Sequence, residues 1–303
     1  MPEKSTKKNI CFIINPISGR KRKKDISNLI NEKLDQERFH TEIKYTRHAG
    51  HAAQLSKASL EEKCDIIVAV GGDGTINEVA SVLVNTEAIF GIIPAGSGNG
   101  LARHLGIPLS VTKALDLIRS GKYIKIDTAT INKIPFISLA GIGFDALVAK
   151  KFAKKKERGF LGYFLTILSE FFKYKPKRYR IFFNESKRIN TRALFVTFAN
   201  SSQFGYNTTI APNAKLTDGK LDVCIAQKPG IFKLPLIANL LLLKRIDRSI
   251  YVNIIQSSGL TVKRKRNRIV NIDGDPVKLK KDLEINVVPS SLNVIVPDHA
   301  KEK

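Results

Sequence analysis

The sequence predicts two domains: an α/β domain over residues 1–125 with a doubly wound, mostly parallel sheet, and a mostly antiparallel domain over residues 126–303. Three observations predict this arrangement. Apolar runs alternate with amphipathic segments in the first part of the chain, and Gly-rich segments follow several of these runs. After about residue 125 the apolar runs are short and separated by turn residues, which is typical of antiparallel strands.

The first part of the chain alternates between strand-like and helical spacing. Apolar, β-branched runs predict strands at residues 9–14, 42–45, 65–70 and 89–93. Amphipathic spacing predicts helices at residues 25–34, 76–84 and 111–118. This alternation indicates parallel strands with helices on both faces of the sheet.

The second part of the chain consists mainly of short strand-like runs. They occupy residues 123–131, 136–140, 179–183, 193–198, 221–226, 259–262, 268–272 and 292–296. Two helical segments interrupt them, one at residues 144–172 that breaks near Gly159 and one at residues 231–243. No run approaches the roughly 18 apolar residues of a membrane span, and the polar N-terminus lacks the features of a signal peptide.

Charge and cysteine content limit the possible partners and compartment. The 51 Lys and Arg residues against 27 Asp and Glu residues give a net charge of +24, which predicts attraction to nucleic acid, anionic lipid or a phosphorylated substrate. Nucleic acid is disfavoured, because Trp is absent and the basic residues are spread along the whole chain. The odd number of cysteines, Cys11, Cys64 and Cys224, predicts reduced thiols and a cytoplasmic, soluble protein.

Three Gly-rich or turn-rich segments follow predicted strands of the α/β domain, at residues 15–20, 71–78 and 94–100. The carboxyl ends of parallel strands form the ligand-binding edge of such a sheet. Glycine lets the backbone approach a phosphate closely, and the helix that follows offers N–H groups and a positive dipole end. The three segments together therefore predict a polyphosphate site.

Asp73 lies among the glycines of the second segment, beside Gly71, Gly72 and Gly74. A carboxylate next to phosphate is unfavourable unless a cation intervenes, so we expect Mg²⁺ there. The sequence has no GxxxxGK[ST] motif, and residues 96–101 do not complete a dinucleotide fingerprint.

Seven segments, in order and spacing from about residue 9 to 297, resemble the diacylglycerol-kinase catalytic family. Residues 71–75 alone are also shared with NAD kinases and phosphofructokinases, whereas the full set points to lipid kinases. The segments are Asn15-Pro16-Ile17-Ser18-Gly19, Gly50-His51-Ala52, Gly71-Gly72-Asp73-Gly74-Thr75-Ile76-Asn77-Glu78, Pro94-Ala95-Gly96-Ser97-Gly98-Asn99, Gly141-Ile142-Gly143-Phe144-Asp145-Ala146, Leu216-Thr217-Asp218-Gly219-Lys220-Leu221-Asp222 and Asp273-Gly274-Asp275-Pro276.

The resemblance implies an ATP- and Mg²⁺-dependent lipid kinase that phosphorylates diacylglycerol or a related lipid. It implies an NAD-kinase-like α/β nucleotide-binding domain and a β-sandwich-like lipid-substrate domain, with the cleft between them and the final segment returning to the first domain. A peripheral position at the inner face of the membrane and a homodimer are compatible with it. The acceptor stays open among diacylglycerol, monoacylglycerol, a sphingoid base, ceramide and an undecaprenol-like alcohol.

The resemblance also implies roles for individual residues. Asp273, Asp275 and Asp73 match catalytic positions, and Asp73 would organise Mg²⁺ on the phosphates. Asp218 would bind a structural Mg²⁺ with the backbone carbonyls of residues such as Lys215 and Lys220. The ATP-binding positions would be Asn15, Pro16, Ser18, Gly19, Thr46, Gly71, Gly72, Asp73, Gly74, Thr75, Asn77, Glu78, Gly96, Ser97, Gly98 and Asn99.

Two positions depart from the family pattern. Gly100 stands where the family often has Asp, and Asp275 stands where it has Glu, which shortens the second acid by one methylene. Asp145 is a candidate partner for an amine of a sphingoid substrate or a cap for the helix that follows it.

The predicted helix at residues 160–172 has a broad apolar surface with basic residues on both sides, at 150–158 and 173–180. This composition is typical of a membrane-docking element and equally of a core helix with solvated ends. The functional alternatives are an NAD kinase-like enzyme and a non-enzymatic lipid- or nucleic-acid-binding protein.

Overall fold

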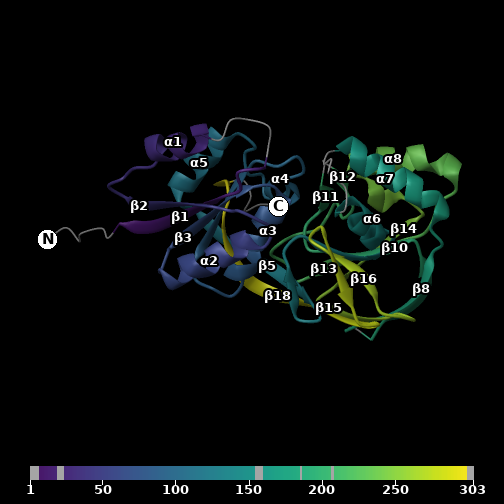
Figure 1. The fold of residues 1–303 in the computed structure, drawn as a ribbon. Coiled ribbons are helices and arrows are strands. Elements are labelled where there is room, and N and C mark those ends of the chain that lie inside the picture. Colours follow the sequence, from purple (N-terminus) through teal and green to yellow (C-terminus); the bar gives the residue numbers. More distant parts are fainter. Residues whose placement is uncertain (1–6, 19–23, 154–159, 185, 206–207, 299–303) are drawn as a thin grey trace. The chain divides into compact units, whose positions relative to one another are not determined.

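A computed structural model describes residues 7–18, 24–153, 160–184, 186–205 and 208–298. The chain divides into two compact units (Figure 1). Unit 1 comprises Met1–Ile126 and Ser290–Lys303, and unit 2 comprises Asp127–Pro289.

Unit 1 is an α/β unit with a parallel sheet in the order β2-β1-β3-β4, extended beside β4 by the last part of β18. The parallel pairing confirms the predicted fold class for this part of the chain. Its elements are β1 (Lys8–Ile14), α1 (Lys24–Lys33), β2 (Phe39–Tyr45), α2 (His51–Glu61), β3 (Ile66–Gly71), α3 (Asp73–Leu83), β4 (Ile89–Pro94), α4 (Gly100–His104) and α5 (Val111–Ser120).

Helices cover both faces of the unit 1 sheet, as Figure 1 shows. Strands β3 and β4 are buried along their whole length, which explains why they are continuous apolar runs rather than alternating ones. Helices α1 and α5 pack on one face through Ile30 and Leu115 among others, and α2 and α3 lie on the other face.

Helix α2 was not predicted from the sequence. Its buried positions carry Ala52, Ser56 and Ser59, so the helix packs through small residues and lacks the apolar periodicity that identifies a helix. The small residues let α2 approach β1 closely, and Ser59 Oγ donates a hydrogen bond of 3.1 Å to Cys11 Sγ on β1.

Unit 2 is mostly antiparallel, as predicted. Its six-stranded sheet has the order β14-β13-β10-β7-β16-β17, and a second group of strands pairs β15 with β8 and with the first part of β18. One apolar core takes side chains from both groups, as expected for a β-sandwich. The strands are β5 (Tyr123–Ile131), β6 (Ile134–Phe136), β7 (Leu139–Gly143), β8 (Lys177–Phe183), β9 (Arg188–Ala193), β10 (Phe195–Ala199), β11 (Gln203–Gly205), β12 (Thr208–Thr209), β13 (Leu221–Ala226), β14 (Val252–Ser257), β15 (Gly259–Lys263), β16 (Arg268–Ile272), β17 (Asp275–Leu279) and β18 (Asp282–Ile295).

Three helices, α6 (Phe144–Ala153), α7 (Phe160–Lys173) and α8 (Leu234–Leu242), cover one face of the six-stranded sheet (Figure 1). Short 3₁₀ turns precede and follow α8, η1 at Ile231–Lys233 and η2 at Ile246–Arg248. Among the described residues, no helix is both long and apolar enough to traverse a lipid bilayer. All three cysteines are free thiols.

Candidate active site

Three loops meet at the carboxyl edge of the unit 1 sheet. Asn15 Nδ2, after β1, donates a hydrogen bond of 3.0 Å to Thr75 Oγ1 in the first turn of α3. Ala95 N, after β4, donates a bond of 2.7 Å to the carbonyl of Gly71 at the end of β3. The structure therefore brings the first, second and third predicted phosphate segments together.

Glycine is required where the second and third loops touch. A Cβ added to Gly96 would lie 2.4 Å from the Cα of Gly72, a distance that neither backbone can accommodate. Gly72 is the N-cap residue of α3, and the sequence offers no Ser, Thr, Asn or Asp there to bond the first N–H groups of the helix. The contact leaves two backbone segments close together beside the positive end of an 11-residue helix, the arrangement that suits phosphate oxygens.

Asp73 binds the third loop directly. Its Oδ2 accepts a hydrogen bond of 2.8 Å from Asn99 N, and its Oδ1 accepts one of 2.7 Å from Gly100 N, at the start of α4. These two N–H groups offset the carboxylate charge that led us to expect a cation. The residue at position 100 contributes through its backbone, so the glycine that departs from the family pattern keeps this bond.

The fit of Asp73 to Mg²⁺ depends on its oxygens. A carboxylate oxygen has two lone pairs, so each oxygen that accepts one N–H retains capacity for a further ligand or water. A carboxylate beside phosphate-binding loops is the donor type that Mg²⁺ takes. The donor set is thus compatible with Mg²⁺, although charge balance alone does not demand it.

Two further side chains of unit 1 hold the loops in shape. Asn99 has a positive φ of 54°, and its amide bonds both the N–H and the carbonyl of Gly96, at 3.1 and 2.9 Å. Arg103 Nε donates a bond of 3.0 Å to the carbonyl of Gly98. Sequence reasoning missed Arg103, because a basic residue in a short helix carries no signal that it turns back onto the preceding loop.

Glu78 fixes the start of α2. Its Oε1 accepts from Gly50 N at 2.8 Å, and its Oε2 accepts from Ala52 N at 3.0 Å. Both carboxylate oxygens therefore bond N–H groups that the start of a helix would otherwise leave unpaired. This contact connects residues 50–52 with helix α3, which carries Glu78.

The remaining predicted nucleotide-binding residues are distributed along the same edge. Thr46 is buried, and its N–H donates to the carbonyl of Ile14 at 2.9 Å. Ser18 Oγ donates to the carbonyl of Asn15 at 3.0 Å. Gly19 lies outside the described residues, Asn77 is half-buried, and the exposed residues are Pro16, Gly74 and Ser97.

The acidic turn of unit 2 is a two-residue β-hairpin. Ile272 on β16 pairs with Asp275 on β17, and the intervening Asp273 and Gly274 both have positive φ, 47° and 99°. These angles are those of a type I′ turn, for which Asp-Gly is a preferred sequence. The turn leaves Asp275 exposed at its end.

Asp273 anchors the chain that enters β7. Its carboxylate accepts hydrogen bonds from the N–H groups of Ile137, Ser138 and Leu139, at 2.7, 2.9 and 2.8 Å. Burial raises the pKa of Asp273 to about 6, and the three N–H donors oppose this rise. The two acids of the motif thus have different environments: three backbone N–H groups bond the Asp273 carboxylate, and Asp275 is an exposed residue.

Asn271 connects this turn to Asp145 in the first turn of α6. Its Oδ1 accepts from Gly274 N at 2.9 Å, and its Nδ2 lies 3.1 Å from both oxygens of Asp145. Burial raises the pKa of Asp145 to about 6, against the hydrogen bond from Asn271. A Cβ at Gly141 would lie 1.7 Å from Asp145 Oδ2, so this carboxylate lies directly against the sheet. Asn271 was also missed as a site residue, because it is a single polar residue among the apolar residues Ile269, Val270 and Ile272 of β16.

The predicted structural metal site lies in the loop that precedes β13. Asp218 Oδ1 accepts from Lys220 N at 3.0 Å, which is an Asx turn. Asp127 Oδ2 accepts from Gly219 N at 2.7 Å, and Asp127 N donates to the carbonyl of Leu216 at 2.6 Å. The loop with Asp218, together with Asp127 on strand β5, offers carboxylate oxygens, the ligand type that Mg²⁺ prefers. Lys215 and Lys220 are exposed, so only their backbone carbonyls are candidate ligands.

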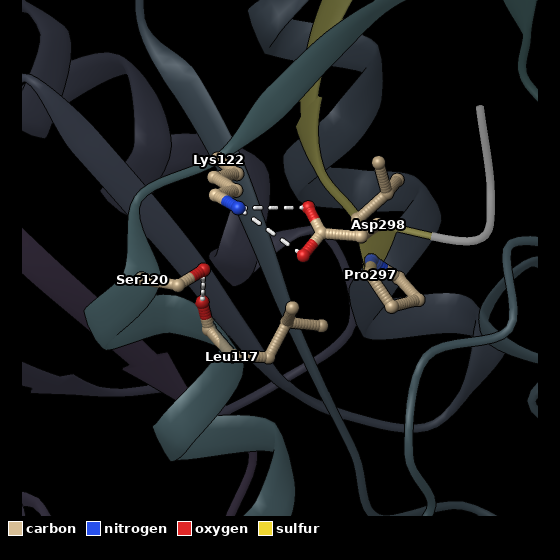
Figure 2. A pocket seen from close by; sticks show the side chains of 6 residues that line it. Leu117, Ser120, Lys122, Pro297 and Asp298 are labelled. Atoms are coloured by element: carbon tan, nitrogen blue, oxygen red, sulfur yellow. Dashed lines mark hydrogen bonds and ion pairs between the residues drawn. The ribbon is translucent and has the colours of Figure 1, made fainter.

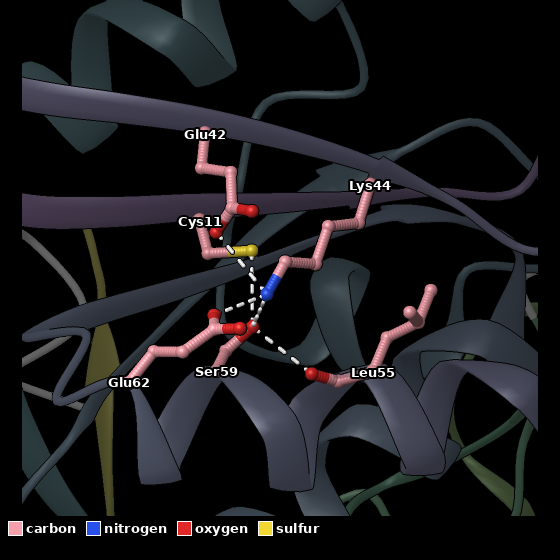
Figure 3. Close-up of polar contacts among 6 residues, drawn as sticks. All are labelled: Cys11, Glu42, Lys44, Leu55, Ser59 and Glu62. Carbon is pink, nitrogen blue, oxygen red and sulfur yellow. Dashed lines mark hydrogen bonds and ion pairs between the residues drawn. The ribbon is translucent and has the colours of Figure 1, made fainter.

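One group of metal-type side chains occurs among the described residues outside these loops, formed by Glu42, Glu62 and Cys64. Figure 3 shows that Lys44 Nζ points between the two carboxylates, 3.1 Å from Glu42 Oε2 and also paired with Glu62. Burial lowers the pKa of Lys44, but hydrogen bonds to Glu62 and Glu42 outweigh it and raise the pKa. The lysine charge therefore offsets one of the two carboxylate charges.

A separate pocket of about 330 Å³ lies at the end of α5 in unit 1 (Figure 2). Lys122 Nζ and Asp298 Oδ1 form an ion pair of 3.0 Å across it, and both side chains are more than half exposed. None of its lining residues belongs to the predicted phosphate loops. They are Leu117, Ser120, Lys122, Val296, Pro297 and Asp298.

Known proteins resemble this chain along most of its length. Residues 9–131 match the family described as diacylglycerol kinase catalytic domain, and residues 138–296 match the YegS C-terminal NAD kinase beta sandwich-like domain. A diacylglycerol kinase from Mycobacterium tuberculosis is 30% identical over 262 residues, 83% of each chain. One from Bacillus subtilis is 29% identical over 273 residues, 88% of this chain and 90% of the relative.

A solved structure has the same fold. A diacylglycerol kinase from Bacillus anthracis superimposes with a TM-score of 0.76 at 18% sequence identity, covering 98% of this chain and 100% of the other. The correspondence includes both the α/β unit and the antiparallel unit.

Proposed function

This chain belongs to the diacylglycerol kinase catalytic-domain family of lipid kinases, and from that premise we propose that it uses ATP and Mg²⁺ to phosphorylate the hydroxyl of diacylglycerol or a related lipid. The observation that carries the proposal is the assembly of three loops at one sheet edge, joined by the bonds Asn15–Thr75 and Asp73–Asn99. ATP is the nucleotide that kinases of this family require as phosphoryl donor.

The loops of unit 1 supply the binding and orientation of the triphosphate in this proposal. Backbone N–H groups at the start of α3, beside the contact of Gly72 with Gly96, bind phosphate oxygens. Asp73 holds the third loop against the second, and its carboxylate would hold Mg²⁺ beside the phosphates. Mg²⁺ would neutralise the charge that develops on the phosphates during transfer.

Asp275 is the proton acceptor that we assign to the reaction. The lipid oxygen bonds to the γ-phosphorus as the bond from that phosphorus to ADP breaks, and the hydroxyl proton passes to the Asp275 carboxylate. We prefer Asp275 to Asp273 because it is exposed, whereas three N–H groups surround the Asp273 carboxylate. Asp273 and Asn271 then act as positioning residues for the turn.

Further parts of the proposal concern metal, membrane and assembly. Asp218, with backbone carbonyls such as those of Lys215 and Lys220, would hold a second, structural Mg²⁺. The charge of +24 favours a peripheral position at the anionic inner face of the membrane. Homodimer formation stays a prediction.

An assay with labelled ATP against a panel of lipids in mixed micelles tests the proposed function. The panel contains diacylglycerol, monoacylglycerol, a sphingoid base, ceramide and a polyprenol, with NAD as the soluble alternative acceptor. We expect label in one lipid, lost when a chelator removes Mg²⁺ and lost in Asp73→Asn. Label in NAD alone, or in no acceptor, would refute the assignment.

A further inference from the structure

The segment at residues 231–250 in unit 2 exposes an unusual amount of apolar surface. Phe232 is 94% exposed and Ile250 is 89% exposed, and no residue of helix α8 is buried. We call the exposed apolar residues of this segment the α8 surface. They are Ile231, Phe232, Leu236, Leu242, Leu243 and Ile250, each at least 49% exposed.

The segment is nevertheless firmly attached to the sheet. Ile237, Leu240 and Leu241, on the other side of α8, pack against a cluster that contains Ala199 and Cys224 of the six-stranded sheet. Ile246 in η2 is 1% exposed and belongs to the same cluster. Helix α8 therefore has one face that contacts the protein and a second apolar face that contacts none of the described residues closely enough to be buried.

Basic residues surround this apolar face. Lys233 precedes α8, and Lys244, Arg245 and Arg248 follow it, all exposed, with Asp247 as the single acid, so the segment carries 4 − 1 = +3. Basic side chains next to exposed Phe and Leu are the composition of a helix that lies in the interface of a bilayer. The apolar side chains then enter the acyl boundary, and the long basic side chains reach the lipid phosphates.

Helix α7 continues the apolar surface. Lys228, just before η1, donates from Nζ to the carbonyl of Tyr174 at 2.9 Å and lies 4.9 Å from the ring centroid of Phe171. Leu234 at the start of α8 packs on the same cluster as Phe171. Helix α7 exposes Leu165, Leu168 and Phe172. Figure 1 shows α7 and α8 next to each other on the same face of the six-stranded sheet.

We propose that the α8 surface docks this protein on anionic membrane, with Phe232 and Leu236 inserted below the phosphates and Lys244, Arg245 and Arg248 bound to them. This inference rests on the proposed function, because an acceptor with long acyl chains resides in a bilayer. It places the main contact on α8 rather than on the basic segments beside α7 that the sequence indicated. Lys154, Lys155 and Lys156 of those segments lie outside the described residues.

Sedimentation with vesicles tests the docking surface. The probe is full-length protein with vesicles of phosphatidylglycerol and phosphatidylcholine, and the variant is Phe232→Ser with Leu236→Ser. Removing two inserted apolar side chains should weaken vesicle binding by about tenfold or more. The matched control is Leu109→Ser with Tyr123→Ser, which removes two exposed apolar side chains of unit 1, 44% and 45% exposed, and should bind as wild type does.

A charge-reversal pair tests the electrostatic part. Lys244→Glu with Arg245→Glu should lower binding to phosphatidylglycerol vesicles at low salt and flatten its dependence on salt. Lys57→Glu with Lys113→Glu, at two exposed lysines of unit 1, makes the same change in net charge and should have a smaller effect. Because all these positions are exposed, thermal melting should match wild type in every variant.

The outcomes separate the docking proposal from the proposed function. Failure of wild type to bind vesicles, or equal binding by the Phe232 and Leu236 variant, overturns the docking surface. A wild-type dimer that this variant converts to monomer, with vesicle binding retained, assigns the surface to a second copy instead. Phosphorylation of a monomeric short-chain diacylglycerol should persist in the Phe232 and Leu236 variant. If wild type phosphorylates no lipid but its vesicle binding depends on Phe232, the proposed function fails and the docking surface stands.

Discussion

Asp73 in unit 1 and Asp273 in unit 2 are each followed by a glycine in the sequence. Both carboxylates accept hydrogen bonds from backbone N–H groups of another segment. Asp73 accepts from Asn99 and Gly100, 26 and 27 residues along the chain, and it opens helix α3 beside glycines that contact the third loop. Asp273 accepts from residues 137–139, 134 to 136 residues away, inside a hairpin turn. Each acid therefore holds a neighbouring segment in place, whatever else it does.

The difference lies in what surrounds the two carboxylates. In unit 1 the surroundings are mainly backbone, brought close by glycines and placed at the positive end of a helix. In unit 2 the Asp273 carboxylate also accepts from backbone N–H groups, but the side chain of Asn271 ties its hairpin turn to the buried Asp145 of α6. The unit 1 site, which backbone contacts form, should be sensitive to an added side-chain atom such as that of a Gly→Ala substitution. The unit 2 turn should be sensitive to substitutions that keep the shape of a side chain and remove its charge, such as Asp→Asn.

The largest expected effect is on kcat, and it distinguishes the roles of Asp273 and Asp275 in the hairpin turn. Asp275→Asn removes the proposed proton acceptor and should lower kcat by about 10²-fold or more with little change in Tm, because the side chain is exposed. Asp273→Asn should lower both kcat and Tm, because one amide oxygen cannot accept the three N–H bonds. Lipid kinase assays and thermal melting on the two variants make the comparison.

Asp275→Glu is the matched control, since it restores the acid that the family has at this position and should keep most of the activity. Near-normal kcat in Asp275→Asn would exclude it as the base. Asp73 would then be the next candidate.

The second prediction tests the backbone site by adding one methyl group. In Gly96→Ala the new Cβ would approach Gly72 Cα to 2.4 Å, so the second and third loops must separate, and the KM for ATP should rise by about tenfold or more. Tm should also fall. Gly74→Ala is the stability control, because a Cβ there has no atom within 4 Å and alanine favours the helix, so Tm should not fall. Unchanged ATP affinity in Gly96→Ala would contradict the role of this contact in the phosphate site.

The two sites also differ in how far the sequence predicted them. The strands and loops of unit 1 were predictable, because apolar runs ending in glycine are local signals. Helix α2 was not, since its buried positions are Ala and Ser, and the start of β18 was not, since residues 282–291 mix polar and apolar side chains. In unit 2 the Asp-Gly turn was predictable, but its bonds to residues 137–139 and to Asp145 through Asn271 connect positions more than 120 residues apart. No local pattern indicates such partners.

The third prediction uses the buried Asp145. Its pKa is raised from 3.8 to about 6 by burial, so its contribution to stability is fully present below pH 3.8 and is lost as the pH rises through 6. Asp145→Asn removes this titration. Between pH 4 and pH 7 this titration should lower the unfolding free energy of wild type by at most about 3 kcal/mol. The variant should lack this decrease. Denaturant unfolding at the two pH values measures the change, and an identical pH dependence for both proteins would contradict the buried, weakly compensated carboxylate.

The smallest expected effect concerns Glu78, the acid of helix α3 that bonds the start of α2. In Glu78→Gln one oxygen still accepts a bond, but the amide nitrogen would face the N–H of Gly50 or Ala52. The lost charge-assisted bond should cost about 1 kcal/mol of stability, since the side chain is only half-buried. Because Asp73 and the third loop are untouched, kcat should change by less than about threefold and any effect should appear in the KM for ATP. Calorimetric melting and steady-state kinetics at varied ATP measure both. A large loss of kcat with unchanged Tm would instead place Glu78 at the triphosphate, and the second loop would then act through a side chain as the hairpin of unit 2 does.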